Sequence, residues 1–126
     1  MGRRGAHMID GKKLLIKILN RFKPRLLSNI KLTAPPGEYD YASVTVNLSD
    51  CDTVLVRCGC NNVTQLLTFT RAYGNATQML SDYYGNTYFR GLYKVDWNTN
   101  QIQVAYGNTL SGRNDLIWIH QVYAIG

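Results

Sequence analysis

Alternation of apolar and polar residues is the feature that most constrains how this chain can fold. Every second residue is apolar through most of three stretches, residues 39–48 (YDYASVTVNL), 87–97 (TYFRGLYKVDW) and 101–106 (QIQVAY). A repeat of two residues is typical of a β-strand that buries one of its faces. A chain with many such strands packs two sheets together or closes one sheet into a barrel.

Four further stretches are expected to be strands, and polar turns separate them. Residues 115–125 are apolar on both faces for much of their length, which predicts a central strand. Asn98-Thr99-Asn100 predicts a hairpin loop, and Gly91 predicts a bulge or a bend inside a strand. The other expected strands are residues 26–33, 53–58 and 63–70, and residues 77–85 are read as either a loop or a short strand.

The expected fold class is all-β: an antiparallel β-sandwich, jelly-roll-like, with a short N-terminal amphipathic helix. Parallel layering is excluded because no helical pattern lies between the strands to supply a crossover. The 126 residues, 45% hydrophobic and 17% charged, fit one domain with a core of its own. No apolar run approaches the roughly 18 residues that a membrane-spanning helix needs.

Composition divides the chain into three regions. Residues 1–7 (MGRRGAH) are interpreted as an expression-tag remnant, because the dipeptide at positions 7 and 8, His-Met, is typical of a cloning site that overlaps a start codon. Residues 8–25 are expected to form a basic N-terminal arm, and residues 26–126 are expected to form the sandwich domain.

The helical spacing of apolar residues in the arm predicts a short amphipathic helix over residues 12–22, and Pro24 ends this helix. Residues 8–31 contain seven basic residues and one acidic residue. The favoured interpretation is that the apolar stripe packs on the domain or on other copies of the chain. Binding to a membrane surface or to nucleic acid phosphates is less favoured, because the helix lacks Trp and no nucleic-acid-binding motif is present. The stripe residues assigned to oligomer contact or attachment are Leu15, Ile18, Leu19 and Phe22.

The three cysteines, Cys51, Cys58 and Cys60, are expected to be free thiols. A disulfide from Cys51 to either of the other two is an alternative, but an odd number argues against a secreted disulfide framework. A zinc site with His120 as fourth ligand is a weaker alternative, because Cys58-Gly59-Cys60 is closer than the usual C-x2-C spacing. No metal and no cofactor is therefore expected.

The sequence shows no catalytic constellation. His120 is expected to lie on the apolar face of the last strand, together with Trp118 and Val122, as a core or edge residue. No nucleophile or metalloprotease motif accompanies it. Asp50 and Asp52 lie in one turn. That carboxylates of this chain form the catalytic pair of a glycan hydrolase stays a weaker hypothesis. We therefore name no catalytic residue and do not expect an enzyme.

Nine tyrosines and two tryptophans are the strongest indication of a binding surface. Tyrosine has an apolar ring and a polar tip, which suits contact surfaces and sugar rings. Four of the tyrosines lie within residues 73–88, beside neutral hydrogen-bonding side chains, which favours a saccharide site. The alternative is that strand proteins are simply rich in Tyr and Thr. The candidate ligand-binding residues are Tyr73, Asn75, Gln78, Asp82, Tyr83, Tyr84 and Tyr88.

Three stretches resemble small β-sandwich domains of tailed-bacteriophage structural and receptor-binding proteins. They are residues 46–56 (VNLSDCDTVLV), 88–97 (YFRGLYKVDW) and 116–126 (LIWIHQVYAIG). The last is similar to a strand followed by V/I-Y-G-I, with Ala124 where glycine is usual. The resemblance spans roughly residues 27–126, rests on pattern, and carries over no particular binding residue.

The resemblance implies a non-enzymatic virion component made in the host cytoplasm. It implies a tail, baseplate or fibre module that adheres to a host-surface glycan. It also implies a homo-oligomer, with a trimer favoured, and other virion proteins as partners. Two alternatives stay open: a carbohydrate-binding module outside any virion and, behind it, a small glycan hydrolase.

Overall fold

Eight β-strands and two short 3-10 turns make up most of what the computed structural model describes, residues 23–107 and 113–126. No helix among these residues is long and apolar enough to cross a membrane. The strands are β1 (Arg25–Thr33), β2 (Ala42–Thr45), β3 (Thr53–Cys60), β4 (Val63–Thr70), β5 (Thr77–Tyr84), β6 (Thr87–Asp96), β7 (Gln101–Gly107) and β8 (Ile117–Ile125); the turns are η1 (Arg71–Tyr73) and η2 (Asn114–Leu116).

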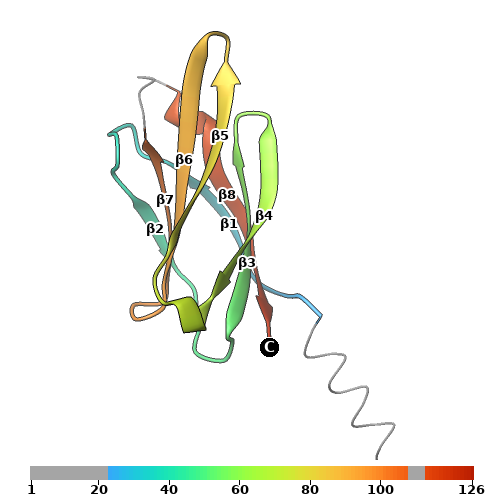
Figure 1. Ribbon diagram of the computed structural model, residues 1–126. Coiled ribbons are helices and arrows are strands. Elements are labelled where there is room, and N and C mark those ends of the chain that lie inside the picture. The colour runs from blue at the N-terminus through green and yellow to red at the C-terminus, as the bar shows by residue number, and fades with distance from the viewer. Residues whose placement is uncertain (1–22, 108–112) are drawn as a thin grey trace, which may run out of the picture.

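The strands form two four-stranded sheets that pack face to face (Figure 1). The first sheet has the order β1-β8-β3-β4 and the second the order β2-β7-β6-β5, and all neighbours are antiparallel. The predicted antiparallel sandwich is confirmed. The prediction that the last strand is central is confirmed too, because β8 lies between β1 and β3.

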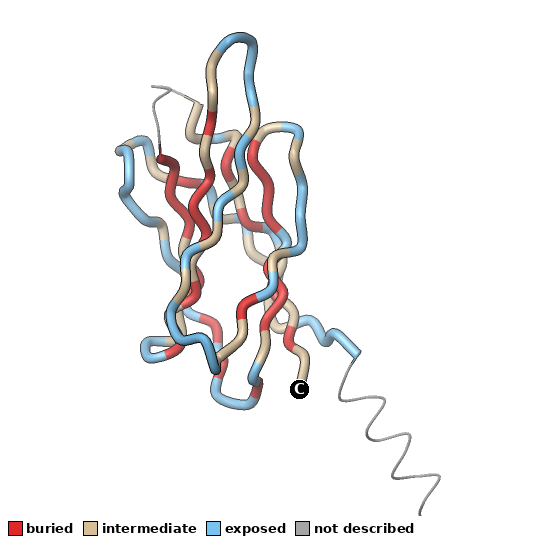
Figure 2. Tube along the Cα trace, in the orientation of Figure 1, coloured by how far each residue is buried: buried red, intermediate tan, exposed pale blue. Residues whose placement is uncertain are grey.

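The core lies between the two sheets and is made by the alternating residues. Buried positions occur in strands of both layers, as Figure 2 shows. In the second sheet the predicted inward residues of β6 and β7 are all buried, from Phe89 to Trp97 and from Ile102 to Tyr106. Asp96 pairs with Gln101 in the ladder, so the predicted hairpin loop at residues 98–100 is confirmed.

Two expected boundaries differ from the structure. Only Ala42–Thr45 of the expected strand 39–48 belongs to β2. Tyr39 has a left-handed φ of 62°, which an extended strand does not adopt. At the other end the ladder with β7 stops at Thr45, opposite Gln101, and the Val46 N–H donates to the Asn100 carbonyl of the hairpin loop at 2.8 Å. The ambiguous segment 77–85 is a full strand, since β5 pairs with β6 along its whole length.

Of the bulge or bend predicted at Gly91, the bulge is wrong. Neither the β5–β6 ladder nor the β6–β7 ladder shifts its register there. The glycine is needed because a Cβ atom at position 91 would lie 2.4 Å from the hydroxyl oxygen of Tyr93, whose ring leans over it. Glycine in this strand therefore marks a close side-chain approach.

The register shift occurs instead in β8, at His120. Arg57 of β3 lies opposite Gln121, but the next residue, Cys58, lies opposite Ile119, so His120 is left without a partner on β3. The extra residue moves the buried positions of β8 from Ile117 and Ile119 to Val122 and Ala124. This corrects the expectation that His120 lies on the same face as Val122: the histidine is exposed, and Val122 is in the core.

The expected helical arm lies almost wholly outside the described residues. This applies to the apolar stripe of Leu15, Ile18, Leu19 and Phe22. Pro24 and the start of β1 at Arg25 are described, and they mark where the sandwich domain begins.

The three cysteines are free and buried, as the favoured interpretation predicted. Burial is the main cause that raises the pKa of Cys58 to about 12 and that of Cys60 to about 11. It also raises the pKa of Cys51, whose thiol lies 3.4 Å from the Leu48 carbonyl. Thiolates are the reactive form of cysteine, so these residues behave as small core side chains at neutral pH.

One hydrogen bond joins the two sheets through the core. The Tyr93 hydroxyl of β6 donates to the Gly59 carbonyl of β3, and Tyr93 is fully buried. On the other side of the same glycine lies the ring of Trp118, and a Cβ atom at position 59 would be 2.2 Å from its Cζ2 atom. Gly59 therefore contacts a core side chain on its inner side and a surface side chain on its outer side.

We predict that Tyr93→Phe lowers the free energy of unfolding by about 1–2 kcal/mol, because it leaves a buried carbonyl without this donor. Urea denaturation followed by circular dichroism measures the change. Tyr73→Phe is the matched control: Tyr73 is 84% exposed, so its loss of a hydroxyl should change stability by less than about 0.5 kcal/mol. Equal effects of the two variants would contradict the role of the buried hydrogen bond.

Candidate functional site

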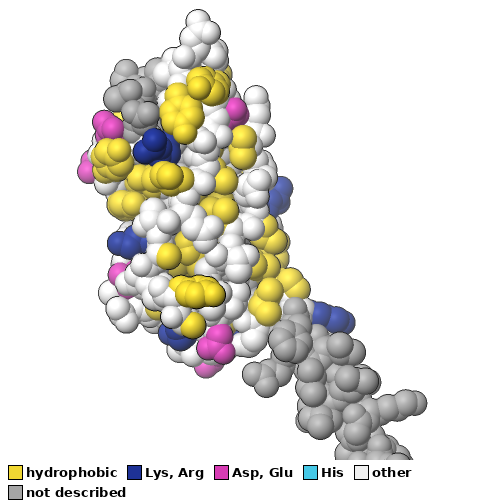
Figure 3. Space-filling view, in the orientation of Figure 1, with side chains coloured by type: hydrophobic (Ala, Val, Ile, Leu, Met, Phe, Trp, Pro, Cys, Tyr) yellow, Lys and Arg dark blue, Asp and Glu magenta, His cyan; other side chains and the backbone are white. Residues whose placement is uncertain are grey.

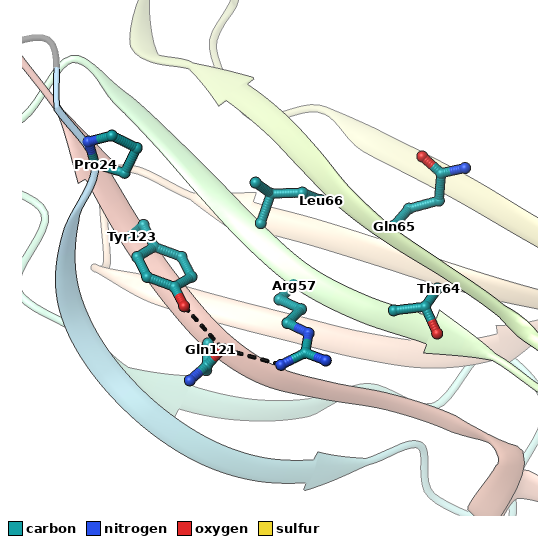
Figure 4. A pocket seen from close by; sticks show the side chains of 7 residues that line it. All are labelled: Pro24, Arg57, Thr64, Gln65, Leu66, Gln121 and Tyr123. Carbon is teal, nitrogen blue, oxygen red and sulfur yellow. Dashed lines mark hydrogen bonds between the residues drawn. The ribbon is translucent and has the colours of Figure 1, made fainter.

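A shallow basin on the outer face of the first sheet is the candidate site (Figure 4). It has a volume of about 530 Å³, and we call it the first basin. Side chains from β3, β4 and β8 form most of its wall, and the residue before β1 closes one side. The lining residues are Pro24, Arg57, Thr64, Gln65, Leu66, Gln121 and Tyr123.

Strand register sets a row of side chains across this face. Leu66 of β4 lies opposite Arg57 of β3, which lies opposite Gln121 of β8, which lies opposite Asn29 of β1. Directly opposed residues on neighbouring strands have Cβ atoms about 5 Å apart, so their side chains meet. The row therefore places one apolar and three polar side chains side by side, from four different strands.

Hydrogen bonds hold the polar part of this row in place. Gln121 Oε1 accepts from the Tyr123 hydroxyl at 2.8 Å and from Arg57 Nη1 at 3.3 Å, two bonds that Figure 4 shows as dashed lines. Gln121 Nε2 donates to Asn29 Oδ1 at 3.1 Å. We call Asn29, Gln121 and Arg57, together with Tyr123 two residues further along β8, the polar row. Gln121 is its centre, because it bonds to the other three members.

A second basin of about 370 Å³ lies beside the first. The two basins share Arg57 and Gln121, so they lie side by side with these polar residues between them, and we call the two basins together the groove. The residues that line the second basin are Asn29, Ile30, Lys31, Arg57, His120 and Gln121.

A stacked pair of rings extends this surface along β8. The rings of Trp118 and His120 lie 3.9 Å apart between centroids, with 26° between their planes. Trp118 and His120 are two residues apart on β8, so both side chains point outward, and the missing side chain of Gly59 leaves room for the indole. The result is a flat aromatic platform next to the second basin.

The groove is positively charged. Lys31 and Arg57 line it, and none of the described residues that line either basin carries a carboxylate. Partial burial, followed by the positive charges of Arg57 and Lys31, lowers the pKa of His120 below its usual 6.5. At neutral pH the His120 ring is therefore neutral and available for stacking or hydrogen bonding.

The tyrosine-rich segment predicted as a ligand site does not gather in one place. η1 carries Tyr73 at one end of β5, whereas Tyr83 and Tyr84 lie at the other end. A strand of this length spans roughly 23 Å, at about 3.3 Å per residue. Tyr88 follows on β6, opposite Tyr83. The predicted set therefore divides between the two ends of the sandwich.

The polar members of that predicted set hold the fold together. Asn75 donates to Asp96 Oδ1 at 3.2 Å and accepts from the Trp97 backbone N–H. The Gln78 side chain donates to the Thr68 carbonyl of β4. The Asp82 carboxylate accepts from the side chain and backbone of the β3–β4 turn, at Asn61 and Asn62. These three side chains link β5 to neighbouring segments.

The tyrosines at the second end form an exposed aromatic tip on the β5–β6 hairpin, which extends beyond the other strands in Figure 1. Tyr83 and Tyr88 pack edge to face at 5.4 Å between ring centroids, and the Arg113 guanidinium lies 4.6 Å above the Tyr84 ring. In Figure 3 hydrophobic side chains, tyrosines included, gather over this part of the second sheet. The tip is an alternative contact surface.

Sequence reasoning missed the polar row. Its members are at positions 29, 57, 121 and 123, and only strand pairing brings them together. A weak signal was present: Arg57 and Gln121 are polar residues inside the two most apolar strands. Exposed polar side chains on otherwise buried central strands indicate an outer face that solvent or a ligand reaches.

Comparison with models of protein families, with curated proteins and with solved structures found no match for this chain.

The geometry suits recognition of a hydroxylated ligand. Arg57 offers several N–H donors beyond the one that Gln121 uses, and Asn29 keeps its amide N–H donors. The Tyr123 hydroxyl donates its proton to Gln121 and can still accept a hydrogen bond. Trp118 and His120 offer ring surface beside them. No cluster of three metal-ligating side chains occurs in the described part of the chain.

We predict that the lowered pKa of His120 makes stability depend on pH. The unfolded chain binds a proton at this residue near pH 6.5, and the folded chain binds it only at lower pH. The stabilising contribution is therefore complete above pH 6.5 and is lost as pH falls through the lower, folded pKa. Urea titrations from pH 7.5 to 5 should show the free energy of unfolding falling more for the wild type than for His120→Asn. Parallel curves for the two proteins would contradict this.

Proposed function

We propose that the protein is an adhesion module that binds a saccharide in the groove of the first sheet. The polar row supplies hydrogen bonds to sugar hydroxyls, and the Trp118–His120 platform supplies a ring surface. Binding alone, without bond cleavage, is the proposed activity. The proposal keeps the saccharide ligand expected from the sequence and moves the site from the tyrosine-rich segment to this face.

The single observation that supports this most is the hydrogen-bonded centre of the polar row. Gln121 is held by Tyr123 and Arg57 on one atom and bonds to Asn29 through the other. Side chains that are already ordered lose less conformational entropy when a ligand arrives. Planar amide and guanidinium groups, fixed beside aromatic rings, fit the paired hydroxyls and apolar faces of a sugar.

The resemblance to phage structural domains supports placing this module in a virion, on a tail, baseplate or fibre. The pairing of β1 with β8 and of β2 with β7 supports the jelly-roll-like part of that expectation for the outer strands, whereas β3 pairs with β4 and β5 pairs with β6 as hairpins. A carbohydrate-binding module outside any virion is the second candidate, and it would use the same groove. Neighbouring genes for tail or lysis proteins would favour the virion.

The second sheet offers a surface for contacts with other subunits. Exposed apolar side chains lie along the segment before β2 and on β5: Tyr39, Tyr41, Met79 and Tyr83, of which Tyr83 is 62% exposed. Exposed apolar groups that gather on one face favour protein contacts. We include a homo-oligomer, with a trimer favoured and other virion proteins as further partners, in the proposal.

We predict that Gln121→Ala weakens binding to glycans on an array about tenfold, because it removes the centre of the polar row and about one hydrogen bond to the ligand. Tyr83→Ala and Tyr84→Ala, at the tip of the β5–β6 hairpin, are the matched controls and should bind as the wild type does. Circular dichroism checks that each variant is folded. Loss of binding in the tip variants alone would move the site back to the tyrosines.

We further predict that size-exclusion chromatography with light scattering gives a mass that is a multiple of the 14.3 kDa chain. Tyr41→Ser together with Met79→Ser should reduce that mass if the second sheet carries the contact, because both side chains are exposed there. A chain lacking residues 8–22 tests the alternative, contact through the arm. A monomer at every concentration would contradict the oligomer.

A further inference from the structure

We infer that the ligand of the proposed saccharide site is anionic and that its charged group binds in the second basin, between Lys31, Arg57 and His120. This inference rests on the proposed function and narrows it to acidic glycans. The charged group is a carboxylate or a phosphate ester on the sugar, and the rest of the glycan follows the polar row into the first basin.

Side chains from three neighbouring strands converge on the second basin. Lys31 comes from β1, His120 from β8 and Arg57 from β3, three strands that are neighbours in the first sheet. All three side chains line one basin of about 370 Å³, together with the amides of Asn29 and Gln121. Two cations, a histidine and two amides in one small cavity form a set of hydrogen-bond donors suited to an anion.

Ion pairs with described carboxylates do not balance the positive charges of Lys31 and Arg57. The ion pairs of the described residues join Arg71 to Asp52 and Arg113 to Asp115, so neither Lys31 nor Arg57 takes part in one. The Arg57 guanidinium donates a hydrogen bond to the neutral Gln121 amide. An acidic ligand would therefore meet cations whose charge is not already neutralised by this part of the protein.

The arrangement of the cations favours an acidic glycan over nucleic acid. Duplex DNA presents a phosphate about every 3.4 Å along each strand, and proteins meet it with several cations along an extended track. Here two cations line the groove: Arg57, which lines both basins, and Lys31, which lines the second. The other residues that line the first basin, among them Thr64, Gln65, Leu66 and Tyr123, are neutral. One charged position followed by neutral hydrogen-bonding and apolar positions fits a glycan with a single acidic group.

The test uses the full chain and pairs of glycans that differ only in charge. One pair is an oligosaccharide with a single galacturonate residue and its methyl ester, a second is a sialylated lactose and its methyl ester, and a third is a trisaccharide with one phosphate ester and the same trisaccharide without the phosphate. Biolayer interferometry at low salt measures each affinity. We expect at least one acidic member to bind tenfold or more tightly than its neutral partner. The pair whose acidic member binds more tightly shows whether the charged group of the ligand is a carboxylate or a phosphate.

Variants then locate the charged group. Lys31→Gln should weaken binding of the acidic member about fivefold and leave any binding of the neutral member unchanged, whereas Gln121→Ala should weaken both. Lys94→Gln is the matched control, because it removes the same charge from the second sheet, where Lys94 lies 5.9 Å from the Tyr41 ring. A fivefold loss in this control as well would indicate general charge attraction and overturn the site.

The outcomes separate this inference from the proposed function. Neutral and acidic members that bind equally, with no effect of Lys31→Gln, would overturn the anionic ligand and leave the saccharide module intact. A 20-base-pair DNA duplex that binds more tightly than every glycan, in a manner sensitive to Lys31→Gln, would overturn it in favour of nucleic acid. Failure of all three pairs and of the full glycan array would overturn both proposals.

Discussion

The contact between Tyr93 and Gly59 is the constraint on which the rest of the structure depends. A tyrosine hydroxyl buried in an apolar core needs an acceptor, and the Gly59 carbonyl on the facing sheet provides one. The ring reaches that acceptor only because Gly91, on its own strand, has no side chain in its way. Gly59 in turn leaves room for Trp118 on its outer side. The bond thus fixes the spacing of the two sheets and ties the core to the aromatic platform of the candidate site.

The irregular register of β8 decides what the surface of the first sheet can do. If β8 were regular, every second residue from Trp118 to Ala124 would share one face, and Val122 would be exposed beside the rings. The extra residue at His120 sends Val122 and Ala124 into the core while Trp118 and His120 stay outside. It also aligns Gln121 with Arg57 and Asn29. One bulge therefore turns Gln121 and Tyr123 to the same face as the platform, and bulges often re-aim side chains in this way beside functional sites.

The sandwich could be predicted from the sequence because alternation is a local property. Residues 87–97 and 101–106 carry their own pattern and their own turn, and the structure matches them closely. The groove could not be predicted in this way, because Asn29, Arg57 and Gln121 meet only through strand order. Sequence proximity was misleading for the tyrosines: Tyr73 and Tyr83 are ten residues apart, yet an extended strand carries them to opposite ends. The bulge was missed because residues 116–125 are apolar at both parities, so the pattern contains no sign of where the face changes.

The distribution of charge gives the two outer faces different chemistry. The described acids lie in loops, turns and the second sheet, and several are already engaged: Asp82 holds the β3–β4 turn, and Asp96 accepts from the backbone of the β6–β7 turn. The groove of the first sheet is thereby left with Lys31 and Arg57 and no carboxylate among its described lining residues. On the second sheet, by contrast, exposed tyrosines lie close to cations, with Lys94 near Tyr41 and Arg90 near Tyr88. Cations beside neutral amides attract a soluble anion, whereas cations partly covered by rings favour burial against protein. The same small sandwich can thus hold a ligand on one face while the other stays available for subunit contacts.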